Sequence, residues 1–389
     1  MHYCQRCIQP DTRPGIFFSE DNICGACLWE DEKKEINWAE REAELQNIAQ
    51  WARNCHAPYD CAIGVSGGKD STFQAIYARD HLGLRSLLVN AEPEGITEIG
   101  RYNIENLKQL GFDVISLRPD PQIARKLIRQ DFFDNLNPII ALEHCLWAST
   151  YLVADRFDIP LIIQGENAGQ TLGVSKHVGT GGDAFSVVKL DTLKTDPLKA
   201  YAKNGIPSEK LFMYHFDLQK LIKKGTQAVW LSYYAKEWSQ PHNAAFAIAR
   251  GMKIRPKESD PYQLGTYRLF SQLDGSLLEV NQLLKYIKFG FGQATDHACY
   301  DIRDGFISRE EGVFLARELD GRCGQKFLAP FLALLEISEN DFWNHANKFR
   351  GPMWKPHDDG KWQLDNPVWT QAPPPNGLSV QSIMQRLGI

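Results

Sequence analysis

The chain has 389 residues, of which 43% are hydrophobic and 23% charged, and its formal net charge is −5. This length suits two or three domains with apolar cores, and no apolar run reaches the roughly 18 residues that a membrane-spanning helix needs. Lys and Arg are scattered rather than gathered into a stripe, which argues against nucleic acid as a partner. The N-terminus lacks the apolar core of a secretion signal, so we expect a cytoplasmic protein.

Residues 1–30 are rich in Cys, Pro and Gly and predict a loop-dominated segment. Two CxxC pairs, Cys4 with Cys7 and Cys24 with Cys27, are separated by sixteen residues. Each CxxC turn places two sulfurs on one side of a tight loop, so two turns complete a tetrahedron for one zinc ion (Zn2+). Because four thiolates leave no open coordination position, the predicted zinc role is structural. An iron–sulfur cluster uses the same ligands and stays open as the alternative.

A charged helical stretch is predicted over residues 31–51, and four buried strands follow it. The strands are short apolar runs separated by segments of helix length, at residues 61–65, 86–90, 112–117 and 161–164. Ser71 is expected to open the helix after the first strand, Gly83 to close it, and Gly111 to follow the next helix. This alternation predicts βαβ units and a parallel sheet.

The turn after the first predicted strand contains Ser66, Gly67, Gly68, Lys69, Asp70 and Ser71. Such a strand-to-helix turn directs backbone N–H groups and a helix N-terminus at one anion. The glycines allow close backbone approach, the serines can donate to phosphate oxygens, and the lysine adds a mobile positive charge. It is not a Walker A loop, because three residues separate Gly64 from Gly68 and an aspartate follows the lysine. A capped turn without a ligand is the alternative.

This turn resembles the PP-loop of N-type ATP pyrophosphatases. The resemblance implies that the loop grips the β,γ-pyrophosphate of ATP as a leaving group while a substrate oxygen attacks the α-phosphorus. It also implies adenine near the end of the second strand, where Asn90 lies. At the end of the fourth strand, Gly165 permits close approach, and Glu166 is expected to hold Mg2+ against the phosphates or, alternatively, only to cap a helix.

The second half of the chain is less regular. Residues 179–203 are rich in Gly and Lys and predict an active-site loop or a crossing between domains. Helical periodicity follows at residues 242–252, 277–289, 309–319 and 327–335. The predicted organisation is a zinc-ribbon segment with a helix (1–50), an α/β domain with a parallel sheet of the PP-loop, HUP-like type (51–250) and a mostly helical domain for substrate or partner (251–389).

Nearly the whole chain resembles the N-acetyl sugar amidotransferases, which are called WbpG-like or PseA-like. The resemblance rests on the two CxxC turns with residues 10–15, the 66–71 loop, residues 164–167, and the block KYIKFGFGQATDH at 285–297 followed by DIRDG at 301–305. The block at 285–297 has no generic structural explanation and is the most specific of these motifs. Gln293, where the family pattern has Arg, and residues 233–243 depart from that pattern, which leaves the exact sugar open.

The resemblance implies an ATP-dependent amidotransferase. Such an enzyme adenylates the acetamido oxygen of a nucleotide-linked N-acetyl sugar and replaces it with ammonia, giving an acetamidino group for a bacterial surface polysaccharide (lipopolysaccharide O-antigen or a nonulosonic acid). Lys285 and Arg303 are the candidates for substrate binding. The catalytic candidates, for neutralising pyrophosphate or handling protons, are Lys69, Lys288, Asp296 and His297. The alternative for each is a solvated helix face or a structural histidine.

Ammonia must come from elsewhere, because Cys4 is assigned to zinc and no other cysteine stands out as a glutaminase nucleophile. The resemblance implies a separate glutaminase subunit paired with a barrel-shaped synthase-like subunit, similar to the two halves of the histidine-pathway enzyme. The main rival function is a tRNA sulfur transferase, since some of these combine cysteine-bound zinc with a PP-loop. That rival needs a reactive cysteine, and Cys145 is the one candidate, although we favour a buried thiol. A catalytically inactive assembly factor is a second rival.

Overall fold

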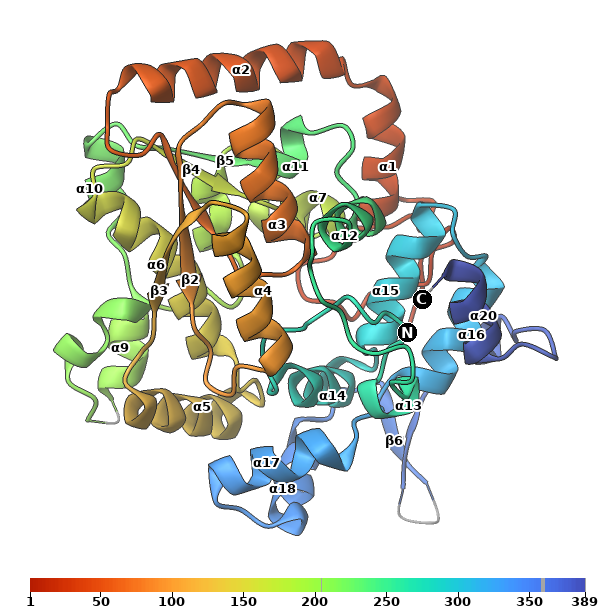
Figure 1. Cartoon of the computed structure of the whole chain (residues 1–389). Coiled ribbons are helices and arrows are strands. Elements are labelled where there is room, and N and C mark those ends of the chain that lie inside the picture. The colour runs from red at the N-terminus through yellow and green to blue at the C-terminus, as the bar shows by residue number, and fades with distance from the viewer. Residues whose placement is uncertain (204, 358–360, 389) are drawn as a thin grey trace.

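A parallel five-stranded sheet lies at the centre of the N-terminal part of the molecule, and its strands follow the order β3-β2-β1-β4-β5 (Figure 1). The computed structural model describes residues 1–203, 205–357 and 361–388. The strands are β1 (Cys61–Gly64), β2 (Ser86–Ala91), β3 (Asp113–Leu117), β4 (Leu161–Gln164) and β5 (Gln227–Trp230). The parallel sheet and its first four strands confirm the prediction from the apolar runs.

The two faces of the sheet are covered by different helices, because successive side chains of a strand point to opposite sides. Cys61 and Ile63 of β1 pack in one core with residues of α2, α3 and α4, whereas Ala62 packs in another with residues of α6. These helices are α2 (Trp38–Asn54), α3 (Lys69–Ile76), which continues as a π-helical turn (Tyr77–His81), α4 (Glu98–Gln109), α5 (Pro121–Asn135) and α6 (Ile140–Arg156). The sheet is therefore doubly wound.

The fifth strand is not apparent from the sequence, because a long irregular connection separates it from β4. This connection contains α7 (Ala168–Thr171), α8 (Ser175–Val178), the 3-10 turns Ala184–Lys189, Ser208–Lys210 and Phe212–Tyr214, α9 (Pro197–Ala202) and α10 (Leu218–Lys223). Ala184 and Val187 pack in the core beneath the sheet. The predicted active-site loop or domain crossing at 179–203 is thus part of the crossover between two neighbouring strands.

The charged stretch at 31–51 is helical as predicted, but two helices divide it. The chain forms α1 (Gly25–Glu35), which starts inside the second CxxC pair, and then α2 after a break. Ile36 has extended backbone, and the Asn37 side chain accepts from the Glu40 backbone N–H at 3.3 Å, which caps the new helix. Figure 1 shows the consequence: α2 lies across the top of the α/β part while α1 descends toward the cysteine segment.

The C-terminal part is mostly helical, as predicted. Its elements are α11 (Leu231–Tyr234), α12 (Gln240–Ile248), α13 (Pro261–Leu264), α14 (Leu278–Phe289), α15 (Gln293–Arg303), α16 (Arg309–Leu319), α17 (Gln325–Leu335), α18 (Glu339–Ala346), a 3-10 turn (Asn347–Phe349), α19 (Val368–Gln371) and α20 (Val380–Leu387). A short antiparallel hairpin joins β6 (Trp354–Pro356) to β7 (Trp362–Leu364).

The cysteine segment shares an apolar core with the C-terminal helices. Cys4, Cys7, Cys24 and Cys27 are buried together with residues of α15, α16 and α20. Arg309 of α16 reinforces this contact, because its Nε donates to the Cys7 carbonyl at 3.1 Å. The two ends of the chain are therefore built into one unit at the side of the sheet, although they are far apart in sequence.

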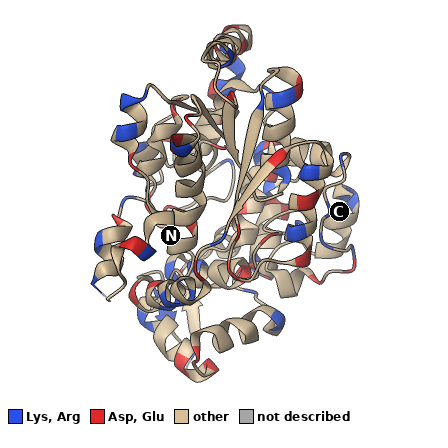
Figure 2. Ribbon diagram, turned by 60° about the vertical axis from the view of Figure 1, so that its left-hand side comes forward, with Lys and Arg blue, Asp and Glu red and all other residues tan. Residues whose placement is uncertain are grey.

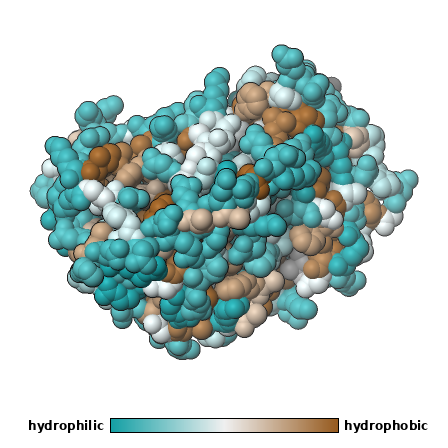
Figure 3. Space-filling view, turned by 90° about the horizontal axis from the view of Figure 1, so that it is seen from above, coloured by the Kyte–Doolittle hydropathy of each residue, from teal (hydrophilic) through white to brown (hydrophobic). Residues whose placement is uncertain are grey.

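The surface carries both signs of charge in a mixed pattern. Figure 2 shows Lys and Arg interspersed with Asp and Glu over the ribbon, and in Figure 3 the face seen from above is largely hydrophilic with small, separate apolar patches. Within the described ranges, no helix is long and apolar enough to cross a bilayer. This distribution agrees with the scattered basic residues of the sequence.

A buried ion pair stabilises the C-terminal part. The Arg268 side chain is 0% exposed, and its Nε donates to Asp301 Oδ2 at 3.2 Å. We predict that Arg268→Ala destabilises the protein by about 3–5 kcal/mol, because it leaves the Asp301 carboxylate buried without its partner. Thermal unfolding measures the loss, and Arg317→Ala, at an exposed ion pair, serves as the control. Equal, small shifts for both variants would contradict this account.

Candidate active site

A cavity of about 320 Å³ opens at the carboxyl ends of β1 and β2. β1 lies between β2 and β4, and ligands of such sheets bind where the strand order reverses. The cavity is lined by the predicted phosphate loop, by the segment after β2, by α6 and by the segment before α14. Its lining residues include Ser66, Gly68, Lys69, Asp70, Glu92, Glu94, Arg118, Glu143, Cys145, Gln272 and Asp274.

The phosphate loop has a shape that only glycine permits at its centre. Gly67 has φ +75°, and a Cβ there would lie 2.8 Å from the Cβ of Asn103 in α4. The Gly68 N–H donates to Ser66 Oγ at 3.3 Å, and α3 then begins at Lys69 with Gly68 as its cap. Ser71 therefore does not open the helix as predicted; its hydroxyl donates to the Gly68 carbonyl at 3.2 Å. The first N–H groups of a helix lack intrahelical partners, so this turn can receive an anion.

Lys69 is the positive charge of this loop. Its Nζ lies 2.7 Å from Asp70 Oδ2, and Asp70 Oδ1 accepts from Asn243 Nδ2 at 2.9 Å. Asn243 belongs to α12, which packs against α3, and it lies in the segment that departs from the family pattern. The lysine is thus held at the cavity wall by two neighbouring polar side chains. The sequence gives no signal that Asn243 belongs to this site, because its hydrogen-bond partner Asp70 is 173 residues away.

A second cavity, of about 510 Å³, adjoins the first. The two share Ile139, Glu143, Leu146, Gln272 and Leu278 as lining residues. Burial raises the pKa of Glu143, whose carboxyl bonds to Thr192. The other polar residues that line the second cavity are Arg13, Asn137, Trp147, His177, Asp191, Thr192, Asn281, Gln282, Lys285 and Lys288. A nucleotide and a second, polar substrate can therefore lie side by side.

Five residues predicted to bind the nucleotide or its metal lie outside the lining of both cavities: Gly67 and Ser71 of the loop, and Asn90, Gly165 and Glu166. The Asn90 amide donates to Ser116 Oγ at 3.3 Å on the neighbouring strand. A Cβ at Gly165 would lie 3.0 Å from Trp238 and 3.1 Å from Gln74, so glycine at this position allows these two side chains to pack against the backbone. Glu166 accepts from the Tyr300 hydroxyl at 2.6 Å. Carboxylates that do line the first cavity are Asp70, Glu92, Glu94, Glu143 and Asp274.

The charged residues of the block at 285–297 have different surroundings. Lys285 and Lys288 both line the second cavity, and the Lys288 Nζ donates to the Asn135 carbonyl at 2.7 Å. Asp296 forms ion pairs with Lys285, at 2.6 Å, and with Arg13 of the cysteine segment. Burial alone would raise the pKa of Asp296, but the two cations bring it below its usual range. Asp296 is thus a paired carboxylate rather than a free acid or base.

His297 is a buried, neutral imidazole. Its Nδ1 lies 2.6 Å from Thr266 Oγ1, and it lines neither cavity. Burial, aided by the positive charge of Arg268, lowers the pKa of His297 well below its ordinary value. The structure therefore places His297 as a core histidine, and the proton-handling role predicted for it and for Asp296 does not fit their surroundings.

Arg303 lies beside the cysteine cluster instead of along the cavities. It donates to the Thr171 carbonyl at 3.1 Å and lies 4.8 Å from the Tyr300 ring centroid. Burial lowers the pKa of Arg303, whereas the nearby groups, first the sulfurs of Cys7, Cys299 and Cys27, raise it. The net result is a pKa above the ordinary value of arginine. This surrounding suits an arginine that balances thiolate charge better than one that binds substrate.

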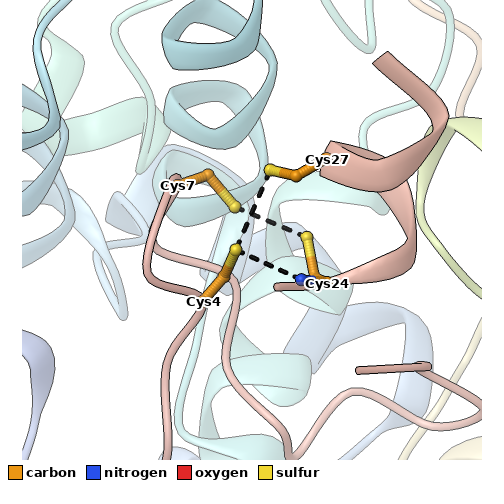
Figure 4. Close-up of side chains that lie close together, drawn as sticks. All are labelled: Cys4, Cys7, Cys24 and Cys27. Carbon is orange, nitrogen blue, oxygen red and sulfur yellow. Dashed lines mark hydrogen bonds between the residues drawn. The ribbon is translucent and has the colours of Figure 1, made fainter. Parts of the chain in front are cut away.

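The four cysteines have the geometry of a single-metal site (Figure 4). The four sulfurs lie within 4.8 Å of one another, and the Cys4–Cys27 and Cys7–Cys24 sulfurs are 3.8 Å and 3.7 Å apart. Zn–S bonds of about 2.3 Å in a tetrahedron give S–S edges of about 3.8 Å. A multi-iron cluster needs wider spacing, because several ions lie between its sulfurs. The residues thus fit one zinc ion with a structural role.

The fold and the loop define an α/β protein with a candidate anion site at the reversal point of the sheet, a four-cysteine site and a helical C-terminal part. Residues 264–368 match the family model described as the C-terminal domain of WbpG-like LPS biosynthesis proteins. This match covers the C-terminal part of the chain and agrees with the predicted resemblance to the WbpG-like family. No curated protein matches the chain.

Among solved structures, NMN synthetase from Francisella tularensis matches at 15% identity, covering 57% of this chain and 99% of its own. Its TM-score of 0.28 is too low to support an inference about fold or activity.

The cysteine geometry generates a prediction about metal content. We expect about one zinc ion per purified chain by elemental analysis, and its loss in Cys24→Ser, because three thiolates bind zinc less tightly than four. Cys55→Ser is the matched control, since Cys55 is exposed and outside the cluster. Several iron ions per chain together with acid-labile sulfide, in place of zinc, would show that the site holds a cluster instead.

Cys145 lines the first cavity but has the surroundings of an unreactive thiol. It is buried, and burial raises its pKa to about 11. At pH 8 only about one thiol in a thousand is then a thiolate. We predict that iodoacetamide labels the exposed Cys55 in the native protein much faster than Cys145, as measured by peptide mass spectrometry. Comparable labelling rates, with loss of turnover on modification of Cys145, would instead favour sulfur transfer.

Proposed function

We propose that the chain is an ATP-dependent amidotransferase that forms AMP and pyrophosphate. The observation that carries the proposal is the glycine-centred loop with Lys69 at the reversal point of the sheet, next to a second polar cavity. The loop gives backbone N–H groups and a lysine for a pyrophosphate group, and the second cavity gives room for an acceptor. We infer from its WbpG-like domain that it acts in the cytoplasm in lipopolysaccharide biosynthesis.

The proposed reaction solves a specific chemical problem. An acetamido oxygen is a poor leaving group, so ammonia cannot displace it directly. The amide oxygen attacks the α-phosphorus of ATP, and the bond from that phosphorus to the bridging oxygen breaks as pyrophosphate departs. Ammonia then adds to the imidate carbon, a proton is lost, and AMP leaves with the former amide oxygen. The product is an acetamidino sugar.

The residues of the chain contribute mainly position and charge. The Ser66–Ser71 loop and Lys69 hold and neutralise the departing pyrophosphate, an effect that can supply several kcal/mol. ATP is used with Mg2+, for which the cavity offers carboxylates that include Glu92, Glu94 and Asp70. Lys285 and Lys288 bind the acceptor. Asp296 holds the Lys285 ammonium in place instead of transferring protons.

The nitrogen source is a separate protein in this proposal. The chain receives ammonia from a glutaminase subunit paired with a barrel-shaped synthase-like subunit, as the sequence resemblance implies. The nucleotide-linked N-acetyl sugar then reacts in the second cavity.

Turnover with ammonium salts tests the function without the partner. We expect the chain, with ATP, Mg2+, ammonium and UDP-linked N-acetyl sugars, to give AMP, pyrophosphate and a sugar in which NH replaces oxygen, detected by mass spectrometry. Lys69→Ala should lower kcat on the order of 100-fold or more, because the leaving group loses its cation. Lys108→Ala, at an exposed ion pair, is the matched control.

The outcomes separate the proposal from its rivals. ATP cleavage without any amidine across a broad sugar panel would favour tRNA thiolation. Absence of ATP cleavage, unchanged by Lys69→Ala, would favour an inactive assembly factor.

A further inference from the structure

The cysteine segment reaches the second cavity through one side chain. Arg13 and Pro14, between the two CxxC pairs, line this cavity together with Lys285 and Lys288 of α14. Thr12 anchors the segment there, since its hydroxyl donates to the Phe289 carbonyl at 2.6 Å. The Arg13 guanidinium lies over the Phe291 ring, 4.7 Å from its centroid. A cation in this position is attracted to the face of the aromatic ring.

Arg13 shares its ion-pair partner with a second cation. Arg13 and Lys285 share one carboxylate, Asp296, as their ion-pair partner. Asp320 also acts on the Lys285 ammonium, so Asp296 is the carboxylate that pairs directly with Arg13, whose side chain is only 10% exposed. A buried guanidinium that shares one carboxylate and keeps an unpaired Nε can bind a further anion.

Three residues that line the second cavity have unpaired polar atoms. Arg13 Nε, Gln272 Oε1 and Gln282 Oε1 are buried and have no hydrogen-bond partner among the residues that the structure describes. All three residues line the second cavity. Buried polar atoms normally find partners, so these atoms indicate a polar ligand. The Arg13 N–H can donate to an acidic group of a ligand, and the two glutamine oxygens can accept from its hydroxyl or amide N–H groups.

We propose that Arg13 binds a carboxylate or phosphate group of the acceptor in the second cavity. Arg13 is then a specificity-determining residue that the cysteine segment supplies, with Lys285 as the second cation of the anion site. The identity of this cavity as the acceptor site rests on the proposed function. The metal site has a consequence beyond local stability, because the fold of the 4–27 segment sets the position of Arg13.

Direct binding tests the proposal without turnover. The probes are N-acetylglucosamine 1-phosphate, N-acetylglucosaminuronic acid and neutral N-acetylglucosamine, titrated by calorimetry in the presence of an ATP analogue that cannot be cleaved between the α and β phosphates. We expect at least one anionic sugar to bind about tenfold or more tightly than the neutral sugar, because charge-assisted hydrogen bonds to a buried guanidinium carry such preferences. The arm that binds more tightly identifies phosphate or carboxylate.

Variants of the same segment locate the preference. Arg13→Gln should remove it, Arg13→Lys should retain part of it, and Arg6→Gln should leave it unchanged, since the Arg6 side chain is 48% exposed and pairs with Asp31. Zinc content, measured in parallel, checks that the segment is folded. A wild-type protein without an anion preference, or one whose preference survives Arg13→Gln, would overturn the proposal. Because no amidine is measured, failure of the proposed reaction would leave this result unaffected, and the reverse also holds.

Discussion

The turn between β1 and α3 is held from both sides by helices that leave no space for a side chain. A Cβ at Gly64 would lie 2.6 Å from Thr150 Oγ1 of α6, and a Cβ at Gly67 would meet the backbone of α4 at 2.9 Å. This packing fixes where α3 begins and therefore where its N–H groups and Lys69 point. The first cavity, its junction with the second cavity and the proposed reaction all depend on this close approach.

Much of this arrangement could be predicted because it is local in sequence. The strand, the glycine pair and the following helix lie within one short segment, and the CxxC spacing alone predicted the cysteine cluster that the structure shows. Apolar runs found four strands of the sheet, and helical periodicity found α14, α16 and α17. The fifth strand was not predicted, because its four residues follow an irregular connection instead of a helix-length segment.

Other features depend on contacts between distant segments, and the sequence carries little signal of them. Arg13 reaches Asp296 across 283 residues, and Asn243 reaches Asp70 across 173. The roles predicted for Asp296, His297 and Arg303 came from residue type within a specific motif. The structure shows instead that one is an ion-pair partner, one is a core histidine and one lies beside the cysteine cluster. Glu143 had a local signal that was easy to overlook, a single acid in the apolar first half of α6.

The cysteine segment and the C-terminal helices form one unit through their shared core, and that unit faces the sheet across the two cavities. In the proposed reaction, the loop positions the leaving group from the sheet side, while α14 and the cysteine segment position the acceptor from the other side. Neither side has the complete set of charges alone.

The fate of the acceptor oxygen tests the central claim most directly. With an acceptor whose acetamido oxygen is labelled with oxygen-18, attack on the α-phosphorus must transfer that label to AMP, which mass spectrometry detects. The account predicts one labelled oxygen in AMP for each amidine formed and unlabelled pyrophosphate. Label in pyrophosphate, or amidine formation with unlabelled AMP, would contradict it.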